Sequence, residues 1–295
     1  MGIENYSVCA IILNYNTSSD TIILYNLLRS FKYNYLDILI IDNNSEEKDF
    51  LKLKKEIPEG CLKRNDQNSG YAGGNNIGIK IALQKDVDYV WLLNPDIRVS
   101  KTTLPLLLET LTNDKKIAAV GPRILKREED DKIFSDGGIV LQDQLCTTLH
   151  KNQNLFSSEV KEIVDYEIDY IDGSCILINT DSFRSVGFLP EEYFMYFEET
   201  DWCLKAKNKG YKLAVNSSCR AYNLCSEKGK KYHFLMMRNR LIFARKYHHD
   251  WKSVVQAYGI NLRNEVINKL KGKYFSPFFL SRLKGYFFGV LRILF

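Results

Sequence analysis

The chain has 295 residues, of which 45% are hydrophobic and 26% are charged. This composition excludes a disordered chain, a collagen-like fibre and a disulfide-stapled miniprotein, and the length allows a sizeable core in one large domain or two modest ones. The formal net charge of +5 is a mild excess that, taken as an average, decides nothing about partners.

The cysteine pattern predicts reduced, buried thiols in a cytosolic protein. The seven cysteines are an odd number, no two are spaced as CxxC, and several lie within apolar runs. A zinc site is not expected, because the usual ligand spacing is absent. The first residues lack the basic start of a signal peptide, and no apolar run reaches the roughly 20 residues of a membrane-spanning helix.

The first hundred residues alternate between short apolar runs and helix-like segments. The apolar runs, which are typical of strands buried on both faces, cover 7–13, 36–42 and 88–93. The helix-like segments cover roughly 18–31, 46–56 and 74–86. This alternation predicts a doubly wound α/β sheet.

The pattern is less regular after residue 117. Strands are expected at 117–125, 133–141 and 169–179, and a charged loop is expected at 126–132. An amphipathic helix over 198–209 ends at Gly210, a favourable C-cap, and a strand follows over 210–222. From residue 230 the pattern is helical to the end, with breaks at Gly272 and Pro277.

Polar residues follow each of the first three apolar runs. These clusters are 14–16, 42–45 and 94–96. Ligands of open α/β sheets bind outside the carboxyl ends of the strands, so we expect the three clusters to converge at one edge. Each cluster would also serve to cap the next helix, but three of them together favour a site.

The segment 68–78 reads NSGYAGGNNIG and is rich in glycine. Glycines allow a ligand to approach the backbone closely, and the helix start that follows presents unpaired N–H groups to an anion; tight packing is the alternative interpretation. The segment is neither a dinucleotide fingerprint nor a P-loop, because GxGxxG after the first strand and GK[ST] are both missing.

Two acidic segments are candidates for chemistry. Asp96 ends an apolar strand in the sequence Asn-Pro-Asp and would suit Mg²⁺ or Mn²⁺ that bridges phosphates, or would simply close a turn. Glu198, Glu199 and Asp201 open a helix, where acids also stabilise the macrodipole. The aromatic residues just before them can desolvate a carboxylate, which raises its pKa and suits it to act as a general base.

Together and in this order, these segments resemble the inverting family 2 glycosyltransferases of the GT-A fold, most of all the bacterial branch that includes rhamnosyltransferases of surface polysaccharide assembly. The resemblance spans about residues 7–245. It rests on AIILNYN, IIDNNS, NSGYAGGNNIG, WLLNPD, DGSCILI, VGFLPEEYFMYFEETDWCLKAKNKGYKL and, more loosely, YHFLMMRNRLIF. It implies an α/β fold with a mostly parallel central sheet flanked by helices, followed by a helical C-terminal extension.

The resemblance also implies roles for individual residues. Glu199 takes the position of the catalytic base, with Glu198 and Asp201 in support. Asp96 takes the position of the metal-binding acid, and Asn223 stands where the family often has a histidine, as a weak neutral ligand. The implied nucleotide-binding residues are Asn14, Tyr15, Asp42, Asn68, Gly70, Gly73, Asn75 and Asn94. The residues that the resemblance implies for binding the acceptor and the sugar of the donor are Asp172, Gly173 and Arg238.

We therefore expect an inverting transferase that moves a sugar from a UDP- or dTDP-sugar to a hydroxyl of a lipid-linked or growing bacterial surface polysaccharide, assisted by Mn²⁺ or Mg²⁺. Two alternatives stay open. A catalytically silent nucleotide-sugar-binding homologue is suggested by Asn94 and Asn223, which replace stronger ligands. A sugar nucleotidyltransferase shares the sheet architecture but should carry a basic, glycine-rich loop after the first strand, where this chain reads NYNTSSD.

The charge is divided unevenly along the chain. Residues 230–295 carry +12, whereas residues 1–229 carry −7. On a helical wheel, Phe279, Leu283, Phe287, Val290, Leu291 and Leu294 share one face of the last helix, and Arg282, Lys284 and Arg292 fall on the other side. This pattern predicts that 274–295 binds an anionic membrane surface, with packing on the catalytic domain or in a homodimer as the alternatives.

The expected organisation is a GT-A catalytic domain over 1–229 followed by a basic helical region over 230–295. Within the first, the nucleotide-binding half covers about 1–100 and the acceptor-side half covers 101–229. We expect a cytoplasmic protein that is peripheral at the inner face of the cell membrane. Nucleic acid is not an expected partner, because no binding motif for it accompanies the basic and aromatic residues.

Overall fold

The computed structural model describes residues 6–224 and 228–295, without the side chain of Asp130. The chain divides into two compact units. The N-terminal unit comprises Met1–Ile139, His150–Phe194 and Glu198–Cys225, and the C-terminal unit comprises Val140–Leu149, Met195–Phe197 and Ser226–Phe295. The short segment 195–197 therefore belongs to the C-terminal unit, although the residues on both sides of it belong to the other.

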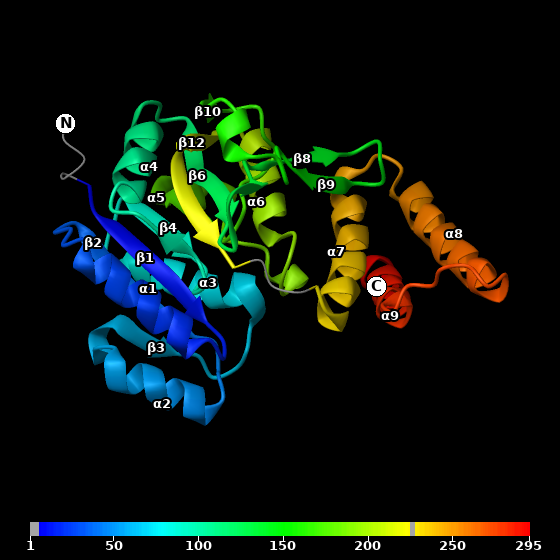
Figure 1. Ribbon diagram of the computed structural model, residues 1–295, viewed down its shortest axis with the longest axis horizontal. Coiled ribbons are helices and arrows are strands. Elements are labelled where there is room, and N and C mark those ends of the chain that lie inside the picture. Colours follow the sequence, from blue (N-terminus) through cyan, green and yellow to red (C-terminus); the bar gives the residue numbers. More distant parts are fainter. Residues whose placement is uncertain (1–5, 225–227) are drawn as a thin grey trace. The chain divides into compact units, whose positions relative to one another are not determined.

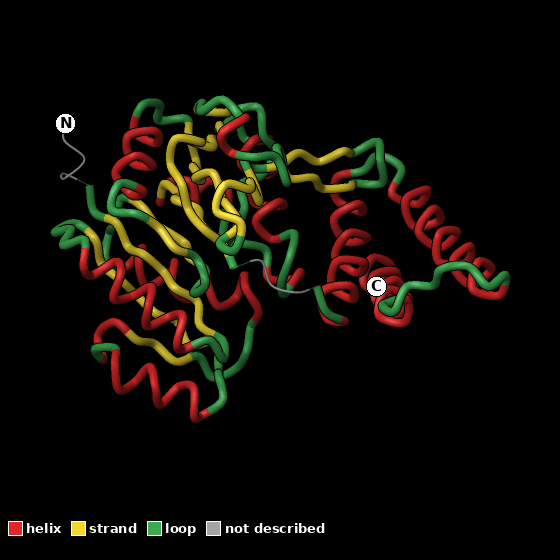
Figure 2. The backbone as a smooth tube through the Cα atoms, viewed as in Figure 1, coloured by secondary structure: helices red, strands yellow, loops and turns green. Residues whose placement is uncertain are grey.

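A mixed β-sheet forms the centre of the N-terminal unit (Figure 2). Along the sheet the strands run β10 (Val164–Asp165), β12 (Lys212–Asn223), β6 (Ile117–Lys126), β11 (Cys175–Asn179), β4 (Tyr89–Leu93), β1 (Val8–Asn14), β2 (Leu36–Asp42) and β3 (Leu62–Arg64). The strands β3, β2, β1 and β4 are mutually parallel, and β11 is antiparallel to both of its neighbours. Two strands lie off this path: β5 (Arg98–Val99) pairs with β12, and β7 (Glu129–Ser135) pairs with β6.

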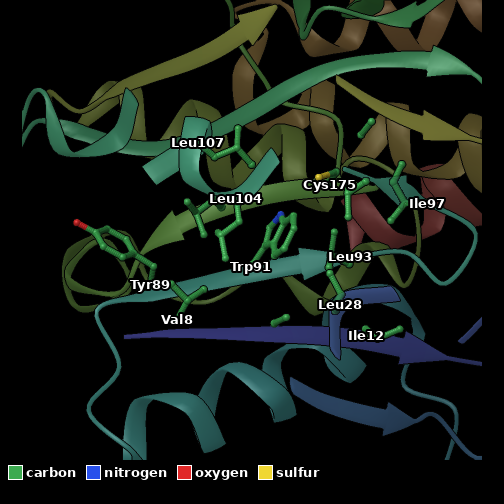
Figure 3. Close-up of a cluster of buried hydrophobic side chains, with 14 of the residues drawn as sticks. Val8, Ile12, Leu28, Tyr89, Trp91, Leu93, Ile97, Leu104, Leu107 and Cys175 are labelled. Carbon is green, nitrogen blue, oxygen red and sulfur yellow. The ribbon is translucent and has the colours of Figure 1, made fainter. Parts of the chain in front are cut away.

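Helices cover both faces of this sheet (Figure 1). In chain order they are α1 (Ser18–Ser30), α2 (Glu47–Glu56), α3 (Gly70–Gln84), α4 (Thr103–Thr112), α5 (Thr180–Val186) and α6 (Glu198–Asn208). Alternate residues of β1, such as Ile12, join Leu28 of α1 and Leu104 of α4 in one core around Trp91 (Figure 3). The other residues of β1, such as Ile11, face α3. Burial of this continuous apolar surface, at about 25 cal/mol per Å², is the main stabilising contribution.

The expected α/β architecture is confirmed, including strands β1, β2 and β4 and helices α1, α2 and α6. The prediction of a charged loop over 126–132 was wrong in part, because strand β7 begins at Glu129 and pairs with β6. The strand expected at 169–179 begins only at Cys175. Five of the six described cysteines are buried free thiols, as expected, whereas Cys61 is half-buried. The seventh, Cys225, lies outside the described residues.

The glycine-rich segment is helical from Gly70 onward, four residues earlier than expected. A side chain at Gly74 would overlap Leu13 of β1, and a Cβ at Gly78 would lie 2.7 Å from Cγ2 of Ile11. These glycines therefore let α3 approach β1 closely, which is the packing interpretation of the motif. Gly70 itself has a φ of +75°, so it begins the helix in a conformation that other residues rarely adopt.

The C-terminal unit contains the helices α7 (Lys230–Tyr247), α8 (Trp251–Leu270) and α9 (Phe279–Leu294). A two-stranded pairing of β8 (Gly138–Leu141) with β9 (Thr147–His150) precedes them in the chain. The helices α7 and α9 lie side by side (Figure 1), with Gly285 and Gly289 against backbone carbonyls of Phe234 and Arg238. An ion pair between Arg282 and Glu265 joins α9 to α8.

The face of α9 that packs against α7 is the one with the small residues, not the one with the aromatic residues. Phe279, Gly285 and Gly289 are buried, whereas Phe287 and Leu291 are 58% and 53% exposed. Phe279, one of the six residues that the helical wheel places on the apolar face, is therefore buried. Phe287, Leu291 and Leu294 of the same predicted face are exposed to solvent. No helix among residues 6–224 and 228–295 has the length and hydropathy required to span a bilayer.

Candidate active site

The parallel strands β1 and β2 end side by side, with Asn14 in register with Asp42. Both side chains are buried, and the Asn14 amide donates to Asp42 Oδ1 at 2.9 Å and to Ser45 Oγ at 2.9 Å. The Asn14 oxygen accepts from the Thr21 hydroxyl at 2.8 Å. Asn14 and Asp42 thus organise this edge of the sheet through contacts within the protein, and the adjacent Tyr15, 45% exposed, faces solvent.

Asn43 connects the end of β2 to the start of α3. Its amide donates to Asn68 Oδ1 at 3.1 Å and to the Gly70 carbonyl at 2.9 Å, and its own oxygen accepts from Ser69 N at 3.2 Å. Asn68 Oδ1 also accepts from Gly70 N at 2.9 Å. Asn43 is thereby a structural link that our selection of site residues from the sequence missed, although it lies within the polar cluster 42–45.

Further along α3, Gly73 and Asn75 are buried. The Asn75 amide donates to the Tyr71 carbonyl at 3.0 Å, and Asn75 Oδ1 has no hydrogen-bond partner among the described residues. A buried amide oxygen without a donor costs free energy, which a bound ligand with a hydroxyl or N–H group can relieve.

Asn94 to Ile97 form a tight turn at the end of β4, in which Ile97 N donates to the Asn94 carbonyl at 3.2 Å. The Asn94 N–H donates to the Ser174 carbonyl at 2.9 Å, which ties this turn to the loop before β11. Asn223 ends β12, whose antiparallel pairing with β5 joins Tyr222 to Arg98. If the same register continued by one residue, Asn223 would lie opposite Ile97, the residue after Asp96.

Glu199, in the first turn of α6, lies near the loop before β11 and the start of α3. The Tyr71 hydroxyl donates to the Gly173 carbonyl at 2.5 Å. A Cβ added at Gly173 would lie 3.0 Å from the Tyr71 hydroxyl and 3.5 Å from Glu199 Cγ. The structure therefore brings together Glu199, Gly173 and Tyr71; the last of these was not among the residues that we selected from the sequence.

The electrostatic environment of these groups is dominated by desolvation. Burial raises the pKa of Glu199 well above its ordinary value, and the negative charges of Glu198 and Asp172 raise it further. Burial and the same three carboxylates raise the pKa of Tyr71 well above that of a free phenol, so Tyr71 is a neutral donor. A carboxylate with a raised pKa in such a setting is a candidate general base.

The other two acids of α6 have structural contacts. Asp201 is fully buried; its Oδ2 accepts from the Tyr193 hydroxyl at 2.7 Å, and its Oδ1 lies 3.2 Å from Lys205 Nζ. These are the contacts of a residue that braces the helix. Glu198 is also buried and adds negative charge beside Glu199.

Asp96 supplies one half-buried carboxylate at the end of β4. Burial raises the pKa of Asp96, and the nearby charges of Asp20 and Asp172 raise it further. Among the described residues no three His, Cys, Asp or Glu side chains form a group that could hold a metal. One carboxylate and neutral oxygens are nevertheless enough for Mg²⁺ or Mn²⁺ when substrate phosphates complete the coordination.

Arg238 belongs to α7 of the C-terminal unit. Its Nε donates to Asn239 Oδ1 at 2.8 Å, and burial together with the charge of Arg292 lowers its pKa. The sequence-based assignment of Arg238 to the sugar side stays a prediction.

Comparisons with known proteins show the family and the fold of this chain. The family model described as Glycosyl transferase family 2 matches residues 9–187, more than half of the chain. The low-salt glycan biosynthesis hexosyltransferase Agl10 of Haloferax volcanii is 29% identical over 205 residues, which cover 68% of this chain and 61% of Agl10. The dTDP-rhamnosyl transferase RfbF of Shigella flexneri is 24% identical over 264 residues, which cover 83% of this chain and 82% of RfbF.

Two solved structures share the fold. GalNAc-T7, solved with UDP, GalNAc and Mn²⁺, has a TM-score of 0.61 at 16% identity, over 95% of this chain and 53% of that one. The mannosyltransferase PcManGT of Pyrobaculum calidifontis, solved with GDP-Man and Mn²⁺, has a TM-score of 0.58 at 11% identity, over 99% of this chain and 88% of that one. These similarities confirm the expected GT-A fold.

Proposed function

Since the chain belongs to glycosyl transferase family 2, we propose that it is an inverting glycosyltransferase that uses Glu199 as its general base. The donor is a UDP- or dTDP-sugar, and the acceptor is a hydroxyl of a lipid-linked or growing bacterial surface polysaccharide. The observation that carries this proposal is the half-buried Glu199 carboxylate with a raised pKa, next to the loop that holds Asp172 and Gly173. The name of RfbF makes dTDP-rhamnose the first donor to test.

In this mechanism Glu199 removes the proton of the acceptor hydroxyl while that oxygen attacks the anomeric carbon of the donor. The bond to the nucleoside diphosphate breaks in the same step, so the configuration at the anomeric carbon inverts. A carboxylate with an ordinary pKa would be a weak base at neutral pH. Desolvation of Glu199, together with the charges of Glu198 and Asp172, makes it a stronger one.

The carboxyl edge of the sheet is the proposed nucleotide-binding region. Tyr15 and the start of α3 supply the exposed ring and the backbone groups there, while Asn14 and Asp42 keep the two strand ends in place. Asn68, Gly70, Gly73 and Asn75 belong to the same region, and the buried Asn75 oxygen is suited to accept a hydrogen bond from the donor.

Asp96 is the proposed ligand of a divalent cation, with Asn223 as a weaker one and Asn94 in the same turn. A bound Mn²⁺ or Mg²⁺ would neutralise the charge that develops on the leaving diphosphate. The turn that carries Asp96 is held by the hydrogen bond from Asn94 N to the Ser174 carbonyl at 2.9 Å and by that from Arg98 to the Pro95 carbonyl at 2.9 Å, which supports the proposal of a fixed ligand position.

A thermal-shift panel of nucleotide sugars, each with and without Mn²⁺, tests donor binding. A ligand that binds only the folded state raises the melting temperature, by an amount that corresponds to about 2.7 kcal/mol at a hundredfold excess over its Kd. We expect a shift with dTDP- or UDP-sugars that depends on Mn²⁺ and is reduced in Asp96→Ala. A shift that is equal with and without the metal, and equal in Asp96→Ala, would contradict the metal role.

We further propose that α9 holds the enzyme at an anionic membrane, where a lipid-linked acceptor is available. The exposed side of α9 carries Leu280, Phe287, Phe288, Leu291 and Leu294. The helical-wheel prediction that puts Lys284 on the other side of the helix was wrong, because Lys284 is exposed and lies four residues from Leu280 and seven from Leu291 on the same face of α9. The region 230–295 has a net charge of +12. An exposed apolar face within a strongly basic region matches the chemistry of an anionic leaflet.

Sedimentation with vesicles tests this membrane proposal. The double variant Phe287→Ser/Leu291→Ser removes exposed apolar groups without touching the face of α9 that packs on α7. We expect it to lose binding to vesicles of phosphatidylcholine with phosphatidylglycerol. Ile23→Ser on α1, which is 52% exposed, is the matched control and should bind as the wild type does. Equal binding by all three proteins would overturn the proposal, and a dimer that the double variant abolishes would assign this face to a second copy instead.

A further inference from the structure

Immediately before α6 the backbone adopts an unusual conformation. Phe194, Tyr196 and Phe197 have φ angles of +66°, +72° and +77°. Bulky residues rarely enter this left-handed region, and they remain there only when the surrounding structure holds them. We refer to residues 194–197 as the strap. Glu198 follows it directly as the first residue of α6, and Glu199 comes next.

One buried side chain holds the middle of the strap. The Asn239 amide donates to the Met195 carbonyl at 2.7 Å and to the Tyr196 carbonyl at 2.9 Å, so its two N–H groups bind two successive peptide units. Asn239 is 0% exposed. Its oxygen accepts from Arg238 Nε at 2.8 Å, and because a guanidinium can only donate, this bond orients the amide with its N–H groups towards the strap.

Two ring contacts lie on the same face of α7 as Asn239. Tyr196 packs edge-to-face on Tyr232 with ring centroids 5.2 Å apart, and Phe197 lies on Phe243, also at 5.2 Å. Positions 232, 239 and 243 are seven and four residues apart and therefore share one face of a helix. This face of α7 thus fits both the carbonyl groups and the aromatic rings of the strap.

The start of the strap is held separately, within the N-terminal unit. The Tyr71 N–H donates to the Phe194 carbonyl at 2.6 Å, and Gly70 leaves no room for a side chain beside that carbonyl. The dihedral angles of residues 195–197 therefore determine the direction in which the chain enters α6. The first turn of α6, where Glu199 lies, follows these residues directly in the chain.

We propose that Asn239 is a positioning residue for Glu199, which it acts on through the strap rather than through contact with substrate. This inference rests on the proposed role of Glu199 as general base. Without the two hydrogen bonds, the strap relaxes towards ordinary backbone angles. The Glu199 carboxylate then loses its alignment with the acceptor hydroxyl and part of its shielding from water.

Asn239→Ala and Asn239→Asp test the inference. The alanine removes both hydrogen bonds, and the aspartate keeps the size and the partner Arg238 but places acceptors against the two carbonyls. We expect kcat to fall by about 10- to 100-fold, as for a displaced catalytic group, with the KM for the nucleotide sugar within about twofold of wild type. We also expect the acid limb of the kcat–pH profile to move to lower pH, because a better-hydrated Glu199 ionises more easily.

Leu241→Ala is the control for stability. Leu241 is buried on α7 and contacts the Gly289 region of α9, so this variant loosens the same helix without touching the strap. It should lower the melting temperature and leave kcat per folded molecule and the pH profile as in the wild type. If Leu241→Ala reproduced the kinetic defect at equal loss of stability, Asn239 would have only a structural role.

Glu199→Gln, measured in parallel, separates this inference from the proposed function. Loss of turnover in Glu199→Gln, combined with normal kcat and an unchanged pH profile in both Asn239 variants, would overturn the positioning role and leave the base assignment intact. Normal turnover in Glu199→Gln would overturn the base assignment itself, whatever the Asn239 variants do.

Discussion

At position 199 a carboxylate lies among groups that disfavour its charge. Burial is the largest cause of its raised pKa, and Glu198 and Asp172 add like charges. Tyr71, whose pKa is also raised well above its ordinary value, stays protonated there and binds the Gly173 carbonyl rather than releasing a proton. Such an environment lowers the stability of the folded protein and makes the Glu199 carboxylate more basic, a combination that is typical of functional sites.

The raised pKa of Glu199 predicts a pH-dependent gain of stability in Glu199→Gln. The folded state retains the Glu199 proton to higher pH than the unfolded state. Above the ordinary carboxyl pKa of 4.5, ionisation therefore stabilises the unfolded wild type more than the folded one, and the wild type loses stability as the pH rises. We expect the variant to melt about 2 °C or more above the wild type at pH 8, and at the same temperature near pH 4.

Differential scanning calorimetry of both proteins across this range measures the effect. Asp181→Asn, which changes an exposed acid at the start of α5, is the control and should show no such trend. A variant that melts below the wild type at pH 8 would show that the ionised Glu199 is well accommodated in the fold.

Individual residues differ in how well their roles could be predicted from sequence. Glu199 and Asp96 were selected because acids at a helix start and at a strand end stand out in the sequence. Asn43, Tyr71 and Asn239 were missed, because their importance depends on partners far along the chain, such as Gly173 for Tyr71. Asn14 was correctly placed at the sheet edge, but the full set of its hydrogen bonds to the protein is visible only in three dimensions.

At the level of elements, the buried strands could be predicted because continuous apolar runs suit a sheet that is covered on both faces. The strands β3 and β5 have three and two residues, too few for any periodicity to appear. The start of α3 was misplaced because glycine is a poor helix former. Its glycines occur in the helix because Leu13, Ile11 and the Phe194 backbone leave no room for larger residues.

Gly70→Ala should be strongly destabilising for the same reason. A Cβ at Gly70 would overlap the Phe194 carbonyl, which is backbone and cannot rotate away, and the φ of +75° disfavours alanine in addition. We expect a loss of about 2–4 kcal/mol in the free energy of unfolding, measured with urea. Gly60→Ala has no atom within 4 Å of the new Cβ and should change this free energy by less than about 0.5 kcal/mol. Similar losses in both variants would refute this account of the α3 start.

At the level of the whole chain, the net charge of +5 combines a C-terminal region of +12 with a preceding region of −7. The uneven distribution of charge along the chain could be predicted from the sequence alone. The face of α9 that is exposed to solvent could not. The helical wheel groups Phe279 with Phe287 and Leu291, but packing of Gly285 and Gly289 on α7 buries Phe279 and leaves the other two exposed.

The charge of the C-terminal region predicts a salt-dependent attraction to membranes. Raising the salt from about 0.1 M to 1 M shortens the Debye length from about 10 Å to 3 Å, so the electrostatic part of vesicle binding should decrease by at least tenfold. Sedimentation with phosphatidylglycerol-containing vesicles at the two salt concentrations measures this decrease. Binding that is unchanged by salt and by the removal of phosphatidylglycerol would contradict an electrostatic contribution.

The central claim is that Glu199 is the base of glycosyl transfer, and nucleoside diphosphate release tests it most directly. The assay combines dTDP-rhamnose or UDP-hexoses, Mn²⁺ and, as the proposed lipid-linked acceptor, a polyprenyl diphosphate that carries one N-acetylhexosamine. We predict acceptor-dependent release by the wild type and at least a 10²-fold slower release by Glu199→Gln, which should still bind the donor. Near-normal release by Glu199→Gln, or none by a wild type that binds the donor, would contradict the account.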